Sequence, residues 1–140
     1  MATTLEQARQ ALTTKVETIK ATWADYPLLV EYYNTNVVNT ATQTKPFLRL
    51  NMTLLDGYQT DLAAQPGHRV LGVIAVEAMV KEGSGMSQAN KLVEFFYPKL
   101  HMTDSITPIR TYAASFATIK PVQGWVGQGA YIPFWFDSRP

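Results

Sequence analysis

The chain has 140 residues, 12 basic and 11 acidic side chains, a formal net charge of +1 and no cysteine. We expect a single domain over residues 1–140, long enough to bury roughly 68–70% of its unfolded surface without a metal or a disulfide, and the lack of cysteine excludes thiolate nucleophiles and thiolate metal sites. The balanced charge offers no basic face for nucleic acid. No apolar run approaches the roughly 20 residues that span a bilayer, and the N-terminus is polar. We therefore expect a soluble protein made in the cytoplasm.

The first predicted element is an amphipathic helix, because apolar residues recur near the N-terminus at three- and four-residue spacing. Thr3 or Thr4 can cap it. Its inward stripe is Leu5, Ala8, Leu12, Val16, Ile19 and Trp23. Pro27 follows the end of this helix, and the aromatic and branched residues 28–33 predict a first strand.

Residues 34–45 are polar and lack periodicity, so we expect an exposed loop between two hairpin strands. Its length exceeds what a hairpin requires, which suggests contact with another molecule, or else a floppy hairpin tip, since surface loops tolerate extra residues. In residues 46–55, Leu48, Leu50, Met52 and Leu54 share one parity, and the other holds Phe47 and the polar Arg49, Asn51 and Thr53, which predicts a half-buried strand. Asp56-Gly57 supplies turn chemistry after that strand, and residues 58–67 form a second connection.

The most apolar segment, residues 68–80, is apolar on both parities and predicts a central strand covered on both faces. Gly83-Ser84-Gly85 predicts a sharp reversal, and Ser84 or Ser87 can cap the helix that follows. That helix lies in the amphipathic segment 86–100, and Pro98 ends it. Its inward side chains are Met86, Ala89, Leu92, Val93, Phe95 and Phe96.

Two strands are predicted in the remaining chain, at residues 108–118 and 130–136. The glycine-rich segment 119–129 between them predicts a loop with an exposed tryptophan, and Pro133 places the last strand at an edge or on a bulge. The fold class is therefore α+β. We expect a mixed, mostly antiparallel sheet of about four or five strands, with the N-terminal helix and a second helix packed on it.

The order of these parts resembles that of the tail terminator proteins of long-tailed bacteriophages. The resemblance covers essentially the whole chain. It depends on a long N-terminal helix, Tyr26-Pro27-Leu28-Leu29-Val30, Tyr33-Asn34, Phe47-Leu48-Arg49-Leu50, Pro66-Gly67, the Gly83-Ser84-Gly85 reversal, Phe95-Phe96 and the segment Ala130-Tyr131-Ile132-Pro133-Phe134-Trp135-Phe136. The glycine-rich segment 119–129 departs from the family pattern.

The resemblance implies structural work in the virion. Proteins of this family form a ring, usually of six subunits, on the head-proximal end of the tail tube. They stop tube growth and present the surface that joins the head. The implied partners are other copies of the chain, the tail tube protein and the head-tail connector protein. The loop at residues 34–45 would then contact a neighbouring subunit or the tail tube. The family needs no cofactor and has no enzymatic activity.

Few residues suggest chemistry. His68 and His101 are the only histidines, and neither has an acidic residue at a ligand-like spacing. Glu31 and Glu77 lie on predicted strands and would serve acid-base chemistry if they met in a cleft. Glu77 is more simply explained by an ion pair with Arg49 or Arg69, or by a contact between subunits. The Gly83–Gly85 turn lacks the lysine and spacing of a phosphate loop.

Aromatic residues indicate surfaces instead, because tyrosine and tryptophan favour interface cores. The last predicted strand, residues 130–136, is apolar on both faces, and a neighbouring subunit would cover such an edge strand. Packing beneath the N-terminal helix explains its aromatic residues equally well. The candidate assembly interface comprises Asn36, Val37, Asn39, Arg49, Glu77, Trp125, Tyr131 and Trp135. Two alternatives remain, a head-tail connector or neck protein and a small-molecule-binding domain with an apolar pocket inside a curved sheet.

Overall fold

The structure is a computed structural model that describes residues 4–33, 42–59 and 68–138. These residues form two α-helices, a 3-10 helix and one mixed six-stranded sheet, which confirms the predicted α+β class with one more strand than expected. In chain order the elements are α1 (Leu5–Lys20), β1 (Val30–Tyr32), β2 (Phe47–Gln59), β3 (His68–Lys81), α2 (Ser87–Phe96), η1 (Tyr97–Lys99), β4 (Arg110–Thr111), β5 (Ser115–Val122) and β6 (Trp125–Ser138).

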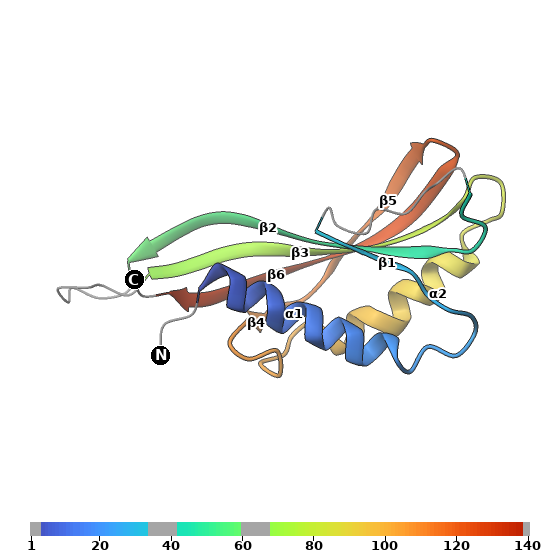
Figure 1. The fold of residues 1–140 in the computed structure, drawn as a ribbon. Helices are drawn as coiled ribbons and strands as arrows, with labels where there is room; N and C mark the ends of the chain where they lie inside the picture. The colour runs from blue at the N-terminus through green and yellow to red at the C-terminus, as the bar shows by residue number, and fades with distance from the viewer. Residues whose placement is uncertain (1–3, 34–41, 60–67, 139–140) are drawn as a thin grey trace.

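The strand order is β1-β2-β3-β6-β4, and β5 also pairs with β6 (Figure 1). The predicted central position of β3 is confirmed, since β2 and β6 flank it. β1 pairs with β2 in parallel, whereas the other pairs are antiparallel. The predicted hairpin across residues 34–45 is therefore wrong. Parallel strands need a crossover, so the length of this segment is a requirement of the fold and not an excess.

Helix α1 begins at Leu5 because Thr4 and Gln7 form a capping box. The Thr4 side chain accepts the Gln7 amide at 3.1 Å, and the Gln7 side chain accepts the Thr4 amide at 2.9 Å. Ala8, Leu12, Val16 and Ile19 are buried as predicted. Leu5 was expected in the same stripe, but it is 51% exposed because it precedes the part of α1 that meets the sheet.

Helix α2 begins without a side-chain cap. Its N-cap residue is Met86, so the predicted capping by Ser84 or Ser87 is wrong. The Ser84 hydroxyl instead donates to the Lys81 carbonyl at 2.6 Å and closes the preceding turn, in which Gly83 and Gly85 both have positive φ. At the other end, Pro98 lies in η1, and α2 stops before it.

Both helices lie on the same side of the sheet (Figure 1). Even-numbered side chains of β3 and β6 pack beneath them, among them Ile74, Val76, Ile132 and Phe134, all at most 1% exposed. Among the described residues no helix lies on the opposite face of β3, and Leu71, Val73 and Ala75 are only half-buried there. The predicted cover on both faces is therefore wrong for this part of β3, although Met79 on the same face is buried with Phe47 and Trp125, and Val73 does not join the helix-facing core.

Strand β2 continues past the predicted turn. Asp56-Gly57 lies inside it, where the register against β3 shifts between Leu54 and Gly57. The ladder absorbs the extra residue as a bulge, which lets pairing continue to Gln59. The turn chemistry of Asp56-Gly57 thus bends a long strand and does not end it.

The predicted strand at 108–118 is split into β4 and β5, and the predicted loop at 119–129 is a hairpin of β5 and β6. Gln123 and Gly124, with φ of 52° and 82°, form its two-residue turn. Pro133 lies within β6, so its predicted edge position is wrong. Its carbonyl oxygen accepts a hydrogen bond from the Tyr112 amide at 2.9 Å. The Pro133 nitrogen, which carries no hydrogen, faces the same side, between the end of β4 and the start of β5, so no hydrogen bond of the sheet is lost there.

Candidate assembly surface

The sheet face opposite the helices, here called the helix-free face, consists of the odd-numbered residues from Arg69 to Glu77 on β3 and from Tyr131 to Asp137 on β6, together with Arg49, Asn51 and Thr53 of β2. Four of the sequence-predicted interface residues lie on it: Arg49, Glu77, Tyr131 and Trp135. Asn36, Val37 and Asn39 lie outside the described residues. Trp125 is treated separately below.

A row of charged residues crosses this face. Glu31, Arg49 and Glu77 lie opposite one another on β1, β2 and β3. Of the two acids, Glu31 forms the salt bridge with Arg49, with 3.8 Å between Nε and Oε2. The register therefore brings Arg49 to Glu77 as expected, but the predicted ion pair of Glu77 with Arg49 or Arg69 is replaced by other contacts. Arg49 also separates the two carboxylates, which argues against an acid-base pair.

Tyr131 is the partner of Glu77. Its hydroxyl donates to Oε2 of Glu77 at 2.7 Å. The phenol ring lies over Gly129, where a Cβ atom would come within 2.6 Å of the hydroxyl oxygen. Burial, together with the hydrogen bond to the carboxylate, raises the pKa of Tyr131 to about 12. A glycine two residues before an aromatic residue on the same strand face is the sequence signal for this contact.

Trp135 lies between two arginines at the other end of the helix-free face. The guanidinium of Arg69 is 3.8 Å from the centre of an indole ring, and that of Arg110 is 5.6 Å away. Arg69 also forms two hydrogen bonds with Asp137, at 2.9 and 3.1 Å, and this contact lowers the pKa of Asp137. The cluster was not predicted, because only the β3–β6 register reveals that Arg69 faces Asp137.

Between the charged row and Trp135 the side chains of β3 are apolar, whereas β2 contributes the exposed Asn51 and Thr53. Leu71, Val73 and Ala75 on β3 are half-buried beside Pro133 on β6. Leu55, next to the β2 bulge, is 58% exposed. An apolar centre bordered by charged and aromatic side chains is the usual anatomy of a protein interface, and tyrosine, tryptophan and arginine contribute most of the binding energy in such surfaces.

Trp125 is interior, so its predicted exposure is wrong. It is 2% exposed and packs against Phe47 and Met79. Its ring meets that of Phe47 edge to face, with 5.0 Å between centroids. The residue lies at the start of β6, and Ile119 of the paired strand β5 packs against this small second core. The tryptophan is thus placed to hold the hairpin on the sheet.

The remaining chemical candidates are separate from one another. His101 accepts the Ala114 amide at Nδ1, at 3.2 Å, and packs against Tyr97, whereas the His68 side chain lies outside the description. Across residues 4–33, 42–59 and 68–138, no three histidine or acidic side chains are grouped as metal ligands would be. Neither helix of this part of the chain is long and apolar enough to cross a membrane.

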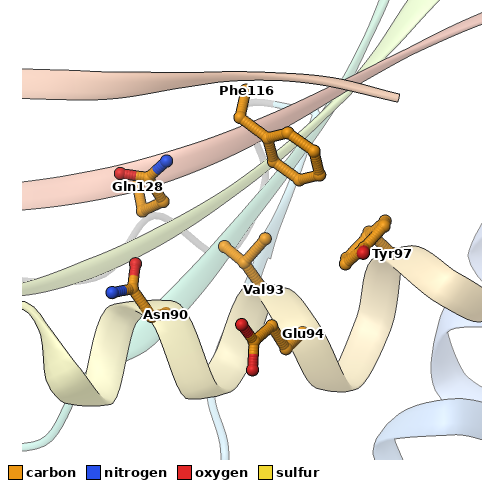
Figure 2. A pocket seen from close by; sticks show the side chains of 6 residues that line it. All are labelled: Asn90, Val93, Glu94, Tyr97, Phe116 and Gln128. Carbon is orange, nitrogen blue, oxygen red and sulfur yellow. The ribbon is translucent and has the colours of Figure 1, made fainter. Parts of the chain in front are cut away.

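A pocket of about 260 Å³ lies between α2 and the β5–β6 hairpin (Figure 2). Sequence reasoning did not anticipate it, because it depends on how the hairpin extends beyond the helix. Its lining combines apolar, amide and acidic groups. The lining residues are Asn90, Val93, Glu94, Tyr97, Phe116 and Gln128.

Comparison with known proteins supports the fold. No family model and no curated protein matches the chain. A solved structure of a protein whose name describes no function matches with a TM-score of 0.69 and 15% sequence identity, covering 98% of each chain. At this identity the likeness concerns the fold alone.

Proposed function

We propose that the chain is a structural protein of a long-tailed bacteriophage that assembles into a ring on the head-proximal end of the tail tube. The ring ends tube polymerisation and provides the surface for the head-tail connector. This function is the one that the resemblance to tail terminator proteins implies, and it requires neither a cofactor nor a reaction centre.

One observation carries the proposal. Arg49, Glu77, Tyr131 and Trp135 lie far apart in sequence, yet they share one sheet face that neither helix of the described residues covers. A half-buried apolar surface with aromatic and arginine side chains at its border is suited to contact with another subunit. We assign this helix-free face to the contacts between neighbouring subunits of the ring.

The test is electron microscopy of the purified protein, alone and with tail tubes, to look for rings. Val73→Glu introduces a charge at the apolar centre of the helix-free face and should abolish rings. Leu5→Glu is the matched control, because Leu5 is 51% exposed in the first turn of α1, where an acidic side chain is favourable. A wild-type protein that forms no ring under either condition, or a Val73→Glu protein that forms normal rings, would contradict the proposal.

A head-tail connector or neck protein shares the same features of size and ring assembly. Antibody labelling of virions distinguishes the two functions, since a terminator lies at the end of the tail tube and a neck protein lies next to the head portal. The second alternative, a small-molecule site inside a curved sheet, lacks a matching cavity in the described part of the chain. The helix-facing side of the sheet is filled by buried side chains such as Ile74, Ile132 and Phe134.

A further inference from the structure

Strand β5 is an open edge. Among the described residues it pairs with β6 alone, so one side of its backbone has no strand beside it. All its residues except Ile119 are exposed, including Phe116 at 50% and Val122 at 51%. Figure 1 shows β5 extending away from the layer of helices with its partner β6. An edge of this length is a template for a further strand.

The pocket between α2 and the hairpin lies directly below this edge. Phe116 of β5 forms one wall and meets Tyr97 edge to face, with 5.0 Å between centroids (Figure 2). Glu94 is the only charged residue of the lining. It is exposed and forms no salt bridge with the described residues. Aromatic walls with one carboxylate suit an incoming lysine or arginine, whose stem packs on the rings.

The chain carries such a residue on the same strand. Phe116 and Thr118 alternate along β5 and so point to the face on which α2 lies. Lys120 follows at the register shift between Ile119 and Val122, where Lys120 and Pro121 together lie opposite Val126, a residue of that same face. Lys120 is exposed, and the described part of the chain gives it no salt bridge. The acidic pocket and the lysine thus occupy opposite ends of one strand face, with Thr118 midway between them.

We propose that β5 pairs antiparallel with β5 of a second copy about a two-fold axis at Thr118. In this register Lys120 of one copy lies directly opposite Phe116 of the other, on the same face, and its ammonium group reaches Glu94 of that copy. Directly opposed side chains on an antiparallel pair have Cβ atoms roughly 4.5–5.5 Å apart, well within the reach of a lysine. Two equivalent pockets are filled at once.

A second copy is favoured over an unrelated peptide because the strand is complementary to itself. Lys120 lies two residues after Thr118, and Phe116 lies two residues before it. Glu94 lines the same pocket as Phe116, so the positive and the negative charge lie on opposite sides of Thr118. Such an isologous contact closes with two copies and leaves no open edge for further growth. Lysine and proline on edge strands commonly prevent pairing. Here Pro121 restricts the contact to residues 116–120, and the acidic pocket turns Lys120 into a recognition element.

The contact is small, so the dimer should be weak. Interfaces well below 1,200 Å² belong to transient complexes. We expect a dissociation constant between about 10 μM and about 1 mM. The pairing is independent of the proposed ring, because Val73 lies on the opposite face of the sheet and the Val73→Glu variant should dimerise normally.

Disulfide trapping tests the register directly, since the chain has no cysteine of its own. In the predicted dimer the two residues at position 118 have Cα atoms about 4.5–5.5 Å apart, which a disulfide can bridge. Thr118→Cys should therefore form a covalent dimer under mild oxidation. Ser115→Cys is the control, because its two copies would lie about 20 Å apart along the strands. Equal trapping of both variants, or none at Thr118→Cys, would overturn the proposal.

Charge reversal tests the pocket. In sedimentation equilibrium up to about 1 mM protein, Lys120→Glu and Glu94→Lys should each weaken dimerisation at least about tenfold, through like-charge contact. The double variant Lys120→Glu/Glu94→Lys should recover most of the affinity. A wild-type protein that remains monomeric over this range, or a double variant as weak as either single variant, would show that Lys120 does not enter the pocket.

Discussion

Leu5 and Leu12 lie two turns apart on α1 and differ completely in burial. Leu12 is fully buried against the sheet, whereas Leu5 is 51% exposed. The same residue type therefore occupies a buried and an exposed position on one helix. Substituting each leucine in turn compares how much burial in the helix-facing core contributes to the free energy of unfolding.

Leu12→Ala should lower the free energy of unfolding by about 2–5 kcal/mol, because the substitution removes buried methyl groups and leaves a cavity. Leu5→Ala should change it by less than about 0.5 kcal/mol, since the side chain loses little contact. Urea denaturation of both variants measures the difference. Similar values for the two would contradict the placement of α1 on the sheet.

Tyr131→Phe removes the hydroxyl bonded to Glu77 and should cost about 1 kcal/mol of stability at pH 8. The pKa of Tyr131 is raised from about 10 to about 12, so the contribution of the protonated hydroxyl is complete below pH 10 and is lost as the pH rises through 12. The difference between wild type and variant should therefore shrink in urea denaturation at pH 11. Tyr112→Phe, at an exposed position, serves as the control. A difference that is unchanged by pH would exclude this role for the bond.

Asp137→Asn removes the partner of Arg69 beside Trp135. The pair is partly exposed, so we expect a loss of only about 0.2–1 kcal/mol at pH 7. The pKa of Asp137 is lowered, hence the carboxylate stabilises the fold above its ordinary pKa of about 4, and this contribution disappears as the pH falls through the lowered value. Wild type and variant should converge in urea denaturation at low pH. Asp104→Asn, at an exposed position, should show no such convergence.

Replacing residues 35–44 by an Asn-Gly turn should detach β1 from β2. The two strands are parallel, with Val30 opposite Leu48 and Tyr32 opposite Leu50, so the chain must return along the whole length of β1. Amide hydrogen exchange at Tyr33, which donates to the Leu50 carbonyl at 3.0 Å, reports the loss. A glycine-serine linker of the original length should preserve the protection. Full protection in the shortened variant would contradict the parallel pairing.

Local periodicity was sufficient to predict α1, α2 and the central strand β3. The burial of Leu12, Val16, Ile19, Ile74 and Phe96 also followed from spacing alone, since each element has a regular apolar face. Periodicity shows which side chains of an element share a face, but it does not show which side of the sheet a helix will cover. The partial exposure of the β3 face that carries Val73 could therefore not be predicted from the sequence.

The candidate surface was predicted only in part. Tyr131 and Trp135 were identified because aromatic residues on one parity of a strand mark a face. Trp125 was misplaced because glycines on either side of it suggested a loop, whereas Gly124 forms a tight turn and Gly127 lets the strand approach Ala78 closely. The partners of Arg49, Arg69 and Glu77 depend on strand register, which a single sequence does not specify.

The position of β6 has a consequence for the order of folding. The other five strands precede it in the chain, yet it pairs with β3 from Lys81 to His68 and lies between β3 and the strands β4 and β5. Until β6 emerges from the ribosome, the nascent chain carries a long apolar strand whose second edge is open, a state prone to aggregation. Its non-local contacts also predict slow folding. Truncation within β6 should therefore produce insoluble protein and not a smaller folded domain.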